Sequence, residues 1–242
     1  EAFGSEENSP NQHLEDTKTW YRLAGEIFLN RSLHKTSTWL SGKARWAYAN
    51  LHNMPLFGSM NDLHEKRFKN PKVIQLFNRY ATYNGSNPYQ APAMLAMIPH
   101  IELNCGAYFP TNGMRSIVNS LVQLAEDVGI TFALNSKVKS ISWEGNNAKA
   151  VSTSSNVYPC DILINNTDIF PFYKALVPEA WHPSKTLREE RSSSAFIWYI
   201  PVDAKHQKLG VHNVLFSMDY KKEFEHLFGT KTLYNDPTVY IH

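Results

Sequence analysis

The stretch GMRSIVNSLVQLAEDVGITFAL, residues 113–134, decides the fold class that the sequence predicts. Apolar residues recur every three or four positions from Met114 to Val128, which predicts an amphipathic helix. Gly129 comes next, and glycine commonly ends a helix because it adopts a left-handed backbone without strain. The apolar run 130–134 then predicts a strand, so the stretch reads as helix, turn and strand.

Three further strand patterns follow this stretch. Val138 and Ile141 stand among polar neighbours in residues 137–143, Asn146 and Asn147 mark a turn into a strand at 148–153, and the apolar run 162–164 predicts a buried strand. A helix followed by several short strands predicts a mixed α/β fold.

The residues before this stretch are mostly helical in pattern. Residues 1–13 are polar and predict a frayed start, whereas the apolar spacing of residues 14–29 predicts a half-buried helix. Pro71 suits the first position of a helix that runs towards Tyr83, and NGSNPY at 84–89 predicts a loop. Another short helix is expected at 93–98.

Residues 27–61 contain no acidic residue and several basic ones. Trp39 and Trp46 stand seven positions apart, which predicts an amphipathic helix with both rings on its apolar side and with Lys43 and Arg45 on its basic side. Such a helix can lie among the headgroups of a bilayer, which makes these four residues candidate membrane contacts. The pattern taken alone favours the other interpretation, a helix that packs on a core and exposes its basic face.

The last third of the chain predicts short elements. A short helix is expected at 170–176, a strand at 212–217, a helix at 220–228 capped by Asp219, and a strand at 237–241. Residues 194–201 predict an aromatic strand, on which Phe196 and Trp198 share one side and Tyr199 faces the other.

Composition excludes several classes of function. The 242 residues include 24 basic and 22 acidic ones, so the net charge of +2 provides no field for binding a nucleic acid. Cys105 and Cys160 form no CxxC pattern and the histidines lack ligand spacing, which argues against a zinc site or a disulfide framework and favours a cytosolic protein. Neither GxSxG, HExxH, GxxxxGK[ST] nor GxGxxG occurs, so the residues by themselves assign no catalytic group.

The block NPKVIQLFNRYATYNGSNPY, residues 70–89, resembles a block of the bacterial phytoene-desaturase-type carotenoid desaturases, which depend on FAD. Further blocks with the same resemblance follow in order, at 98–102, 109–114, 124–129, 138–141, 164–168, 191–195, 212–217 and 236–240. The number and order of these blocks carry the resemblance, which covers nearly the whole chain and is weakest over the first sixty residues.

The resemblance implies a Rossmann-type FAD-binding domain that is interleaved with a helical and β-sheet substrate domain. Residues 1–110 are expected in the substrate and membrane-contacting region, 111–175 in the FAD-binding domain, and 176–242 again in the substrate domain. The dinucleotide fingerprint of this family is expected before Glu1 and another flavin-contacting segment after His242, which makes the chain an internal piece.

Four residues match family positions near FAD. The resemblance places Val138 beside the adenine, and it places Asn166, Thr167 and Asp168 in a turn that follows a parallel strand close to the cofactor. Such turns line the ligand crevice of an open α/β sheet, although Asn and Asp also simply shape turns and cap helices. PTNGM at 110–114 departs from the Pro-x-Gly-Gly-Met of the family, because Asn112 replaces a glycine.

The reaction implied by the resemblance is removal of hydride from a carotenoid single bond to FAD, which creates a double bond. A polyene binds by burial of its apolar surface and must leave a lipid layer, so the resemblance favours a cytoplasmic protein on a membrane surface. Phe196, Trp198 and Tyr199 become candidate walls of the substrate tunnel, or ordinary sheet core. The alternatives are a hydroxycarotenoid 3,4-desaturase, a carotenoid isomerase, or a lipid- or polyene-binding module without chemistry.

Overall fold

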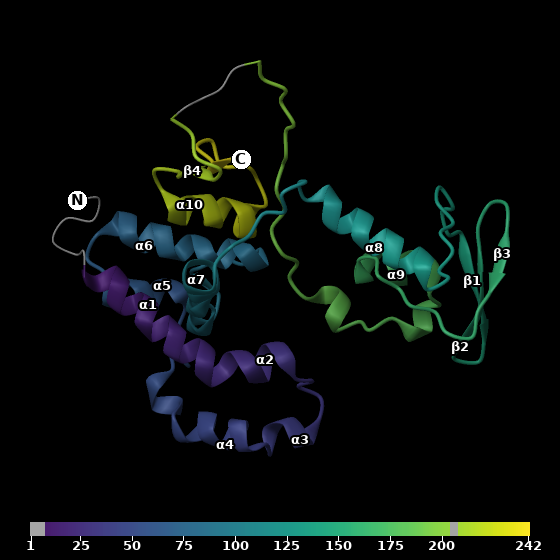
Figure 1. Ribbon diagram of the computed structural model, residues 1–242, viewed down its shortest axis with the longest axis horizontal. Coiled ribbons are helices and arrows are strands. Elements are labelled where there is room, and N and C mark those ends of the chain that lie inside the picture. Colours follow the sequence, from purple (N-terminus) through teal and green to yellow (C-terminus); the bar gives the residue numbers. More distant parts are fainter. Residues whose placement is uncertain (1–7, 204–207) are drawn as a thin grey trace. The chain divides into compact units, whose positions relative to one another are not determined.

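The computed structural model describes residues 8–203 and 208–242, except for the side chains of Asn8, Glu26 and Phe28. The chain divides into two compact units. Unit 1 comprises the chain up to Tyr108 together with Ser192–His242, and unit 2 comprises Phe109–Arg191. Figure 1 labels most of the helices and strands of the two units, which are described separately below.

Unit 1 begins with a long helical run. α1 (Asn8–Trp20) continues through a π-helical turn (Tyr21–Gly25) into α2 (Glu26–Asn30), which confirms the helix predicted for 14–29. The frayed start predicted for 1–13 is wrong for residues 8–13, since α1 already begins at Asn8, and residues 1–7 lie outside the described part. The polar composition misled the prediction because His13 is fully buried among rings that lie far along the chain.

The single amphipathic helix predicted to carry both Trp39 and Trp46 is wrong. The structure instead has α3 (Thr36–Trp39), α4 (Gly42–Ala49) and a 3-10 turn (Leu51–Asn53). The break occurs because Ser41 caps a new helix, its hydroxyl oxygen accepting the N–H of Ala44 at 3.2 Å. Ala44 and Ala47 form the buried side of α4, so the two tryptophans do not share an apolar face: Trp39 packs on these alanines and on Ile27, while Trp46 is 48% exposed.

The centre of unit 1 is formed by α5 (Met60–Arg67) and α6 (Pro71–Asn78). Ser59 and Asp62 cap α5 reciprocally, the N–H of each donating to the other side chain at 2.8 and 3.1 Å. Pro71 occupies the start of α6 as predicted, and the predicted loop at 84–89 contains Gly85 with a φ of +62°. Buried side chains of these elements form the main core, namely Met60, Phe68, Val73, Phe77, Tyr80, Ala81 and Ala91.

Short helical pieces complete the first segment of unit 1. A 3-10 helix (Arg79–Asn84) follows α6, and another (Ala93–Met97) leads into α7 (Ile98–His100) and a π-helical turn (Ile101–Cys105). The short helix predicted at 93–98 is therefore present, in a tighter form.

The second segment of unit 1 contains β4 (Asn213–Leu215), α10 (Tyr220–Phe224), a π-helical turn (Glu225–Thr230) and β5 (Val239–Ile241). The strands pair antiparallel, with Asn213 opposite Ile241, and Asp219 caps α10 as predicted by accepting the N–H of Lys222 at 3.1 Å. The strand predicted at 194–201 is wrong, because these residues have no strand partner in the described part of the chain.

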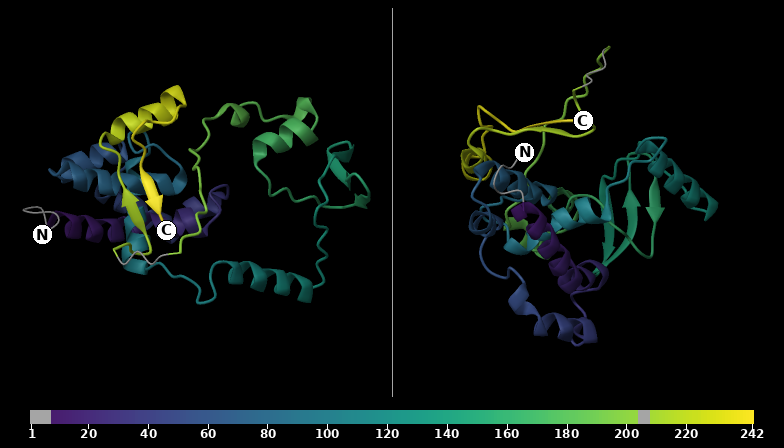
Figure 2. Two further views of the ribbon diagram at one scale, coloured as in Figure 1. Left: turned by 90° about the horizontal axis from the view of Figure 1, so that it is seen from above. Right: turned by 60° about the vertical axis from the view of Figure 1, so that its left-hand side comes forward.

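Unit 2 combines one long helix with a three-stranded sheet (Figure 2). α8 (Arg115–Asp127) matches the prediction, and Gly129 follows it with a φ of +85°. β1 (Ser140–Glu144), β2 (Asn147–Ser152) and β3 (Val157–Pro159) form an antiparallel meander in the order β1-β2-β3, with Ile141 opposite Val151. The strands predicted at 130–134 and 162–164 are wrong, and β3 was not predicted, since the pairing partner of β2 comes from a weakly apolar segment.

The helix predicted at 170–176 is present as α9 (Ile169–Leu176), followed by 3-10 turns at Glu179–Trp181 and Thr186–Arg188. Trp143 of β1 meets Trp181 edge to face, with ring centroids 5.2 Å apart, which ties this segment to the sheet. None of the described helices, in either unit, has the length and apolar composition that a membrane span requires.

Candidate functional site

The turn before α9 in unit 2 contains three of the residues predicted near a cofactor. Asn165 Oδ1 accepts from the backbone N–H of Thr167 at 3.2 Å and from its hydroxyl at 2.7 Å, which fixes the turn. Asp168 caps α9 by accepting the N–H of Phe170 at 2.8 Å, and it also forms an ion pair with Arg191. Asn166 is exposed, and its side chain makes no hydrogen bond within the described residues.

Because of these contacts, the side chains of the turn differ in whether they are available to a ligand. Asp168 is already engaged at a helix N-terminus, where a carboxylate is favoured by the helix dipole. The amide of Asn166 remains available to a ligand, and the structure therefore shows the capping role of Asp168 while its contact with a cofactor stays a prediction.

Val138 also belongs to unit 2 and lies two residues before β1, not within a strand as predicted. Its side chain is exposed, and Lys139 next to it donates its N–H to Ser152 O at 2.8 Å. In the turn at 110–114, where Asn112 replaces a glycine of the family pattern, the residue with the left-handed backbone is Gly113 at a φ of +77°. Asn112 is therefore not required to adopt a glycine conformation.

The aromatic segment predicted as a tunnel wall belongs to unit 1. Phe196, Trp198 and Tyr199 are 87%, 72% and 91% exposed, so the described residues give them no enclosing cavity. The rings of Phe196 and Trp198 contact each other with centroids 6.0 Å apart, as expected for two residues on one side of an extended chain.

Unit 1 contains a cluster of four polar and aromatic residues that the sequence did not predict. The hydroxyls of Tyr80 and Tyr83 both donate to the carboxylate of Glu102, the first at 3.2 Å. The guanidinium of Arg79 lies 5.1 and 5.6 Å from the centroids of the two rings and 3.9 Å from Glu102. Burial, and then the nearby carboxylate, raise the pKa of both tyrosines, which keeps the phenols protonated.

A second unpredicted cluster is the buried histidine pair of unit 1. The ring of His13 meets those of His64, Phe68 and Phe77 edge to face or nearly so, while His64 Nδ1 lies 2.7 Å from Asn78 Oδ1. Both ring nitrogens of His13 and Nε2 of His64 have no hydrogen-bond partner among the described residues. Burial lowers the pKa of His13 to about 3 and that of His64 to about 4, so both rings are neutral at physiological pH.

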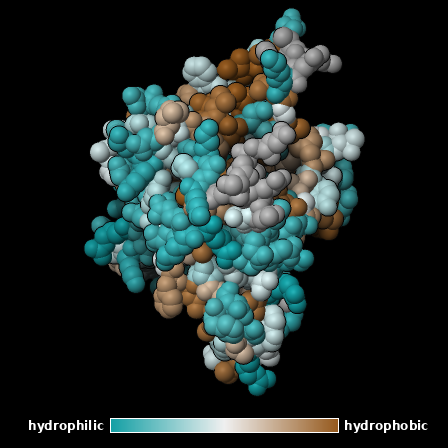
Figure 3. Space-filling view, turned by 90° about the vertical axis from the view of Figure 1, so that its left-hand side faces the viewer, coloured by the Kyte–Doolittle hydropathy of each residue, from teal (hydrophilic) through white to brown (hydrophobic). Residues whose placement is uncertain are grey.

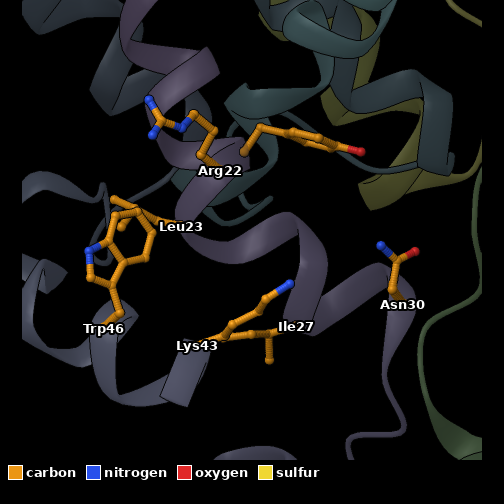
Figure 4. Close-up of a pocket in the computed structure, with 7 residues that line it drawn as sticks. Arg22, Leu23, Ile27, Asn30, Lys43 and Trp46 are labelled. Atoms are coloured by element: carbon orange, nitrogen blue, oxygen red, sulfur yellow. The ribbon is translucent and has the colours of Figure 1, made fainter. Parts of the chain in front are cut away.

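Two of the four candidate membrane contacts line a cavity of about 450 Å³ between residues 21–30 and α4 (Figure 4). Lys43 and Trp46 line this cavity, Arg45 is exposed on the same helix, and Trp39 packs on the buried alanines of α4. The structure thus brings Lys43 and Trp46 together and assigns Trp39 a packing role.

Comparison with known proteins identifies the family. Residues 45–194 match the model of the flavin-containing amine oxidoreductases, which is more than half of the chain. The chain belongs to this family.

Three individual relatives give a more specific comparison than the family model. The chain is 43% identical, over its whole length, to the 1-hydroxycarotenoid 3,4-desaturase of Flavobacterium sp. (strain P99-3). It is 29% identical to the 4,4'-diapolycopene oxygenase of Methylomonas sp. and 28% to the 4,4'-diaponeurosporene oxygenase of Staphylococcus aureus (strain USA300), over 79% of the chain in both cases. The chain spans 49% of the length of the first relative and 39% of the other two.

The family implies FAD, and the chemistry of the unit 2 residues fits part of such a site. An adenine offers an apolar face, for which Val138 presents an exposed apolar side chain. The ribityl and isoalloxazine groups offer donors and acceptors, for which the amide of Asn166 is available. The chemistry of these two side chains is compatible with one part of the flavin, and their contact with it stays a prediction.

Proposed function

We propose that this chain forms the polyene-binding region and part of the Rossmann-type flavin domain of an FAD-dependent carotenoid desaturase. The observation that carries the proposal is the 43% identity, in an alignment that covers the whole chain, to a 1-hydroxycarotenoid 3,4-desaturase. It favours a hydroxylated carotenoid over phytoene as the substrate. In the reaction a carbon–carbon single bond loses a hydride and a proton and becomes a double bond, and FAD when bound supplies the hydride acceptor.

The apolar surface of unit 2 supports a flavin domain of the Rossmann type. α8 presents Ile117, Leu121 and Leu124 to solvent, each 45–60% exposed, and the extended residues Ile162 and Ile164 are more exposed still. A helix with an apolar stripe beside apolar extended segments is what a parallel sheet with helices on its faces requires.

The residues of the chain act on the substrate and cofactor by binding and orientation. Val138, Asn166, Thr167 and Asp168 hold part of the flavin, and Phe196, Trp198 and Tyr199 contact the polyene. Rings of this size supply large apolar contact areas, which a hydrocarbon needs because it offers no hydrogen bonds. Trp46, Lys43 and Arg45 contact the surface of the lipid layer from which the polyene is drawn, while Trp39 stabilises the fold of that region.

The substrate proposal is tested by supplying the complete polypeptide with FAD and either a 1-hydroxycarotenoid or phytoene in detergent micelles. We expect turnover of the hydroxylated carotenoid, seen as a shift of its absorption bands to longer wavelength as the conjugated system lengthens. Turnover of phytoene alone would assign the protein to the phytoene desaturases. Polyene uptake without turnover and without a flavin spectrum would favour the non-catalytic binding module.

The cofactor proposal predicts that Asn166→Ala weakens FAD binding about tenfold, the loss of one hydrogen bond of about 1.4 kcal/mol. Titration of flavin fluorescence measures this change. Asn156→Ala, in the turn between β2 and β3, is the matched control and should leave the affinity unchanged. An unchanged affinity in Asn166→Ala would remove this residue from the flavin site.

A further inference from the structure

One carboxylate of unit 1 lies among aromatic and basic side chains. Tyr80 and Tyr83 belong to the 3-10 helix Arg79–Asn84, in which side chains at this spacing lie above one another, and their rings stack with centroids 5.6 Å apart. Both hydroxyls donate to Glu102, which comes from the π-helical turn Ile101–Cys105. Because π-helical turns occur frequently at functional sites, the cluster is a candidate for binding a ligand.

The negative charge of this carboxylate is balanced within the cluster. The guanidinium of Arg79 lies 3.9 Å from Glu102, and it also lies over the rings of both tyrosines. A positive charge at this distance reduces the attraction of the carboxylate for a second cation. The cluster therefore favours a neutral ligand that donates a hydrogen bond over a positively charged one.

Glu102 can accept a further hydrogen bond. A carboxylate has about four acceptor positions, and hydrogen bonds from the described residues fill two of them. The side chain of Glu102 is 29% exposed and Tyr83 is 54% exposed, whereas Tyr80 is buried. A hydroxyl group from solvent can therefore reach the carboxylate on the side of Tyr83 while the hydrogen bond from Tyr80 stays in place.

The surface around this carboxylate is apolar. Ile101 and Leu103 flank Glu102 in the chain and are exposed, and the ring of Tyr108 is more exposed still. Apolar side chains of this kind gain free energy when a hydrocarbon covers them, whereas the carboxylate needs a hydrogen-bond donor in place of water. A ligand that combines a hydrocarbon body with a hydroxyl group meets both requirements.

The aromatic segment at 194–201 begins close to this cluster. Ser193 donates its N–H to Gly85 O at 2.9 Å, and Gly85 follows Tyr83 by two residues. An extended chain advances about 3.3 Å per residue, so Phe196 lies within about 10 Å of that contact. Figure 1 shows the segment as a green trace that leaves the helices of unit 1, and Figure 3 shows brown hydrophobic side chains gathered at the upper end of the view, the level that this trace reaches. A polyene along the segment can place one end at Glu102.

We propose that Glu102 and Tyr83 form a specificity-determining site that binds the hydroxyl group at one end of a hydroxylated polyene. The hydroxyl group inserts between the two side chains, donating to the carboxylate of Glu102 and accepting from the phenol of Tyr83, whose exposed ring moves aside. A hydrocarbon in the same place would remove water from the carboxylate without replacing its hydrogen bond, so the site discriminates against it. The inference rests on the proposed function, for which it names the residues that recognise the substrate.

The test compares two polyenes that differ only in the hydroxyl group, a 1-hydroxycarotenoid and the corresponding hydrocarbon. Each partitions between detergent micelles and the complete polypeptide, whose bound FAD is kept reduced so that no hydride is removed from the polyene. The absorption of the protein fraction after gel filtration measures the bound polyene. Because the two polyenes dissolve differently in micelles, the quantity compared is the change in their affinity ratio between wild type and variant.

We expect Glu102→Gln to lower the affinity for the hydroxylated polyene relative to the hydrocarbon about tenfold, because a neutral acceptor replaces a charged one. Tyr83→Phe keeps the ring and should lower this ratio about threefold, through the loss of one neutral hydrogen bond. Glu65→Gln, at an exposed position of α5, is the matched control and should leave the ratio unchanged. The affinity for the hydrocarbon should not fall in any of the three variants.

Two results would overturn the proposal. An unchanged ratio in Glu102→Gln and Tyr83→Phe would mean that the hydroxyl group binds elsewhere, and the Tyr83→Phe result decides alone if Glu102→Gln does not fold. Equal loss of both polyenes in the two variants would assign the cluster to the stability of unit 1. In either case turnover of the 1-hydroxycarotenoid by the wild type still tests the desaturase function, whereas a wild type that binds neither polyene would contradict the proposed function itself.

Discussion

Two buried histidines of unit 1 have pKa values well below those they would have in water. His13 lies fully buried with two ring nitrogens that have no partner among the described residues, and His64 keeps one contact, to Asn78. Arg67 lowers the pKa of both rings, and it lies over the ring of Trp20 and pairs with Asp16. A second positive charge on either ring would therefore be placed in a site that excludes water and already faces a cation.

This arrangement predicts a pH dependence of stability. The folded pKa values of about 3 and 4 lie below the unfolded value of 6.5. The free energy of unfolding is therefore highest above pH 6.5, and it decreases as the pH falls towards the folded pKa values, because the unfolded state binds more protons. Each histidine should remove about 1.4 kcal/mol per pH unit within that window. Urea unfolding at several pH values between these limits measures the slope.

The matched variant for this prediction is His13→Phe, which keeps a ring in the same aromatic surroundings. It should reduce the pH slope by about half, because one of the two titrating groups is removed. An unchanged slope would show that other groups dominate acid unfolding.

At the scale of elements, the second segment of unit 1 depends on one buried carboxylate. Glu223 of α10 is 6% exposed and accepts the hydroxyl of Ser217 at 2.8 Å and the N–H and hydroxyl of Thr238, both at 2.7 Å. Ser217 follows β4 and Thr238 precedes β5, so a single side chain joins the helix to both strands. The strands are three residues each and would be marginal without this connection.

We expect Glu223→Ala to lower the free energy of unfolding by about 2–3 kcal/mol, because the buried hydroxyl of Ser217 and the two partly buried donors of Thr238 lose their acceptor. Chemical denaturation monitored by circular dichroism provides the measurement. Glu225→Ala, on the following turn, is the control and should change stability by less than about 0.5 kcal/mol. A similar loss in both variants would mean that helix propensity, not the buried contact, sets the effect.

At the scale of the whole molecule, unit 1 is assembled from two segments that are separated by unit 2 in the sequence. Gln75 Nε2 donates to Ser217 O at 2.9 Å, Ser193 N donates to Gly85 O at 2.9 Å, and Tyr89 meets Phe224 edge to face. The assignment of residues 1–110 and 176–242 to a substrate region and of 111–175 to the flavin domain is not tested by this division and stays a proposal. The unit boundary itself lies at 191–192.

The division predicts where a protease attacks first. Residues Glu189–Val202 have no regular structure, and Arg188 and Arg191 are exposed. Local unfolding concentrates in segments with few contacts, so brief trypsin digestion should cut first after these arginines and leave the cores of both units intact. Mass spectrometry identifies the sites, and Arg188→Gln should slow cleavage there; a first cut within α5 or α6 would contradict the prediction.

The sequence by itself determined the elements whose signals are local. The apolar spacing of α8 and the glycine after it, Pro71 at the start of α6, and Asp219 before α10 depend only on neighbours in the chain, which is why these predictions are confirmed. The ordered sequence blocks also pointed to the family that the comparison identifies.

The tertiary structure alone decided the features that depend on distant partners. A strand exists only where another segment pairs with it, so 130–134, 162–164 and 194–201 carry strand patterns without being strands, whereas Val157–Pro159 pairs with β2 despite a weak pattern. The burial of His13 against α5 and α6, and the meeting of Arg79 with Glu102, likewise join residues far apart in the chain. Periodicity and caps act over one or two turns, and they contain no information on which segments lie side by side.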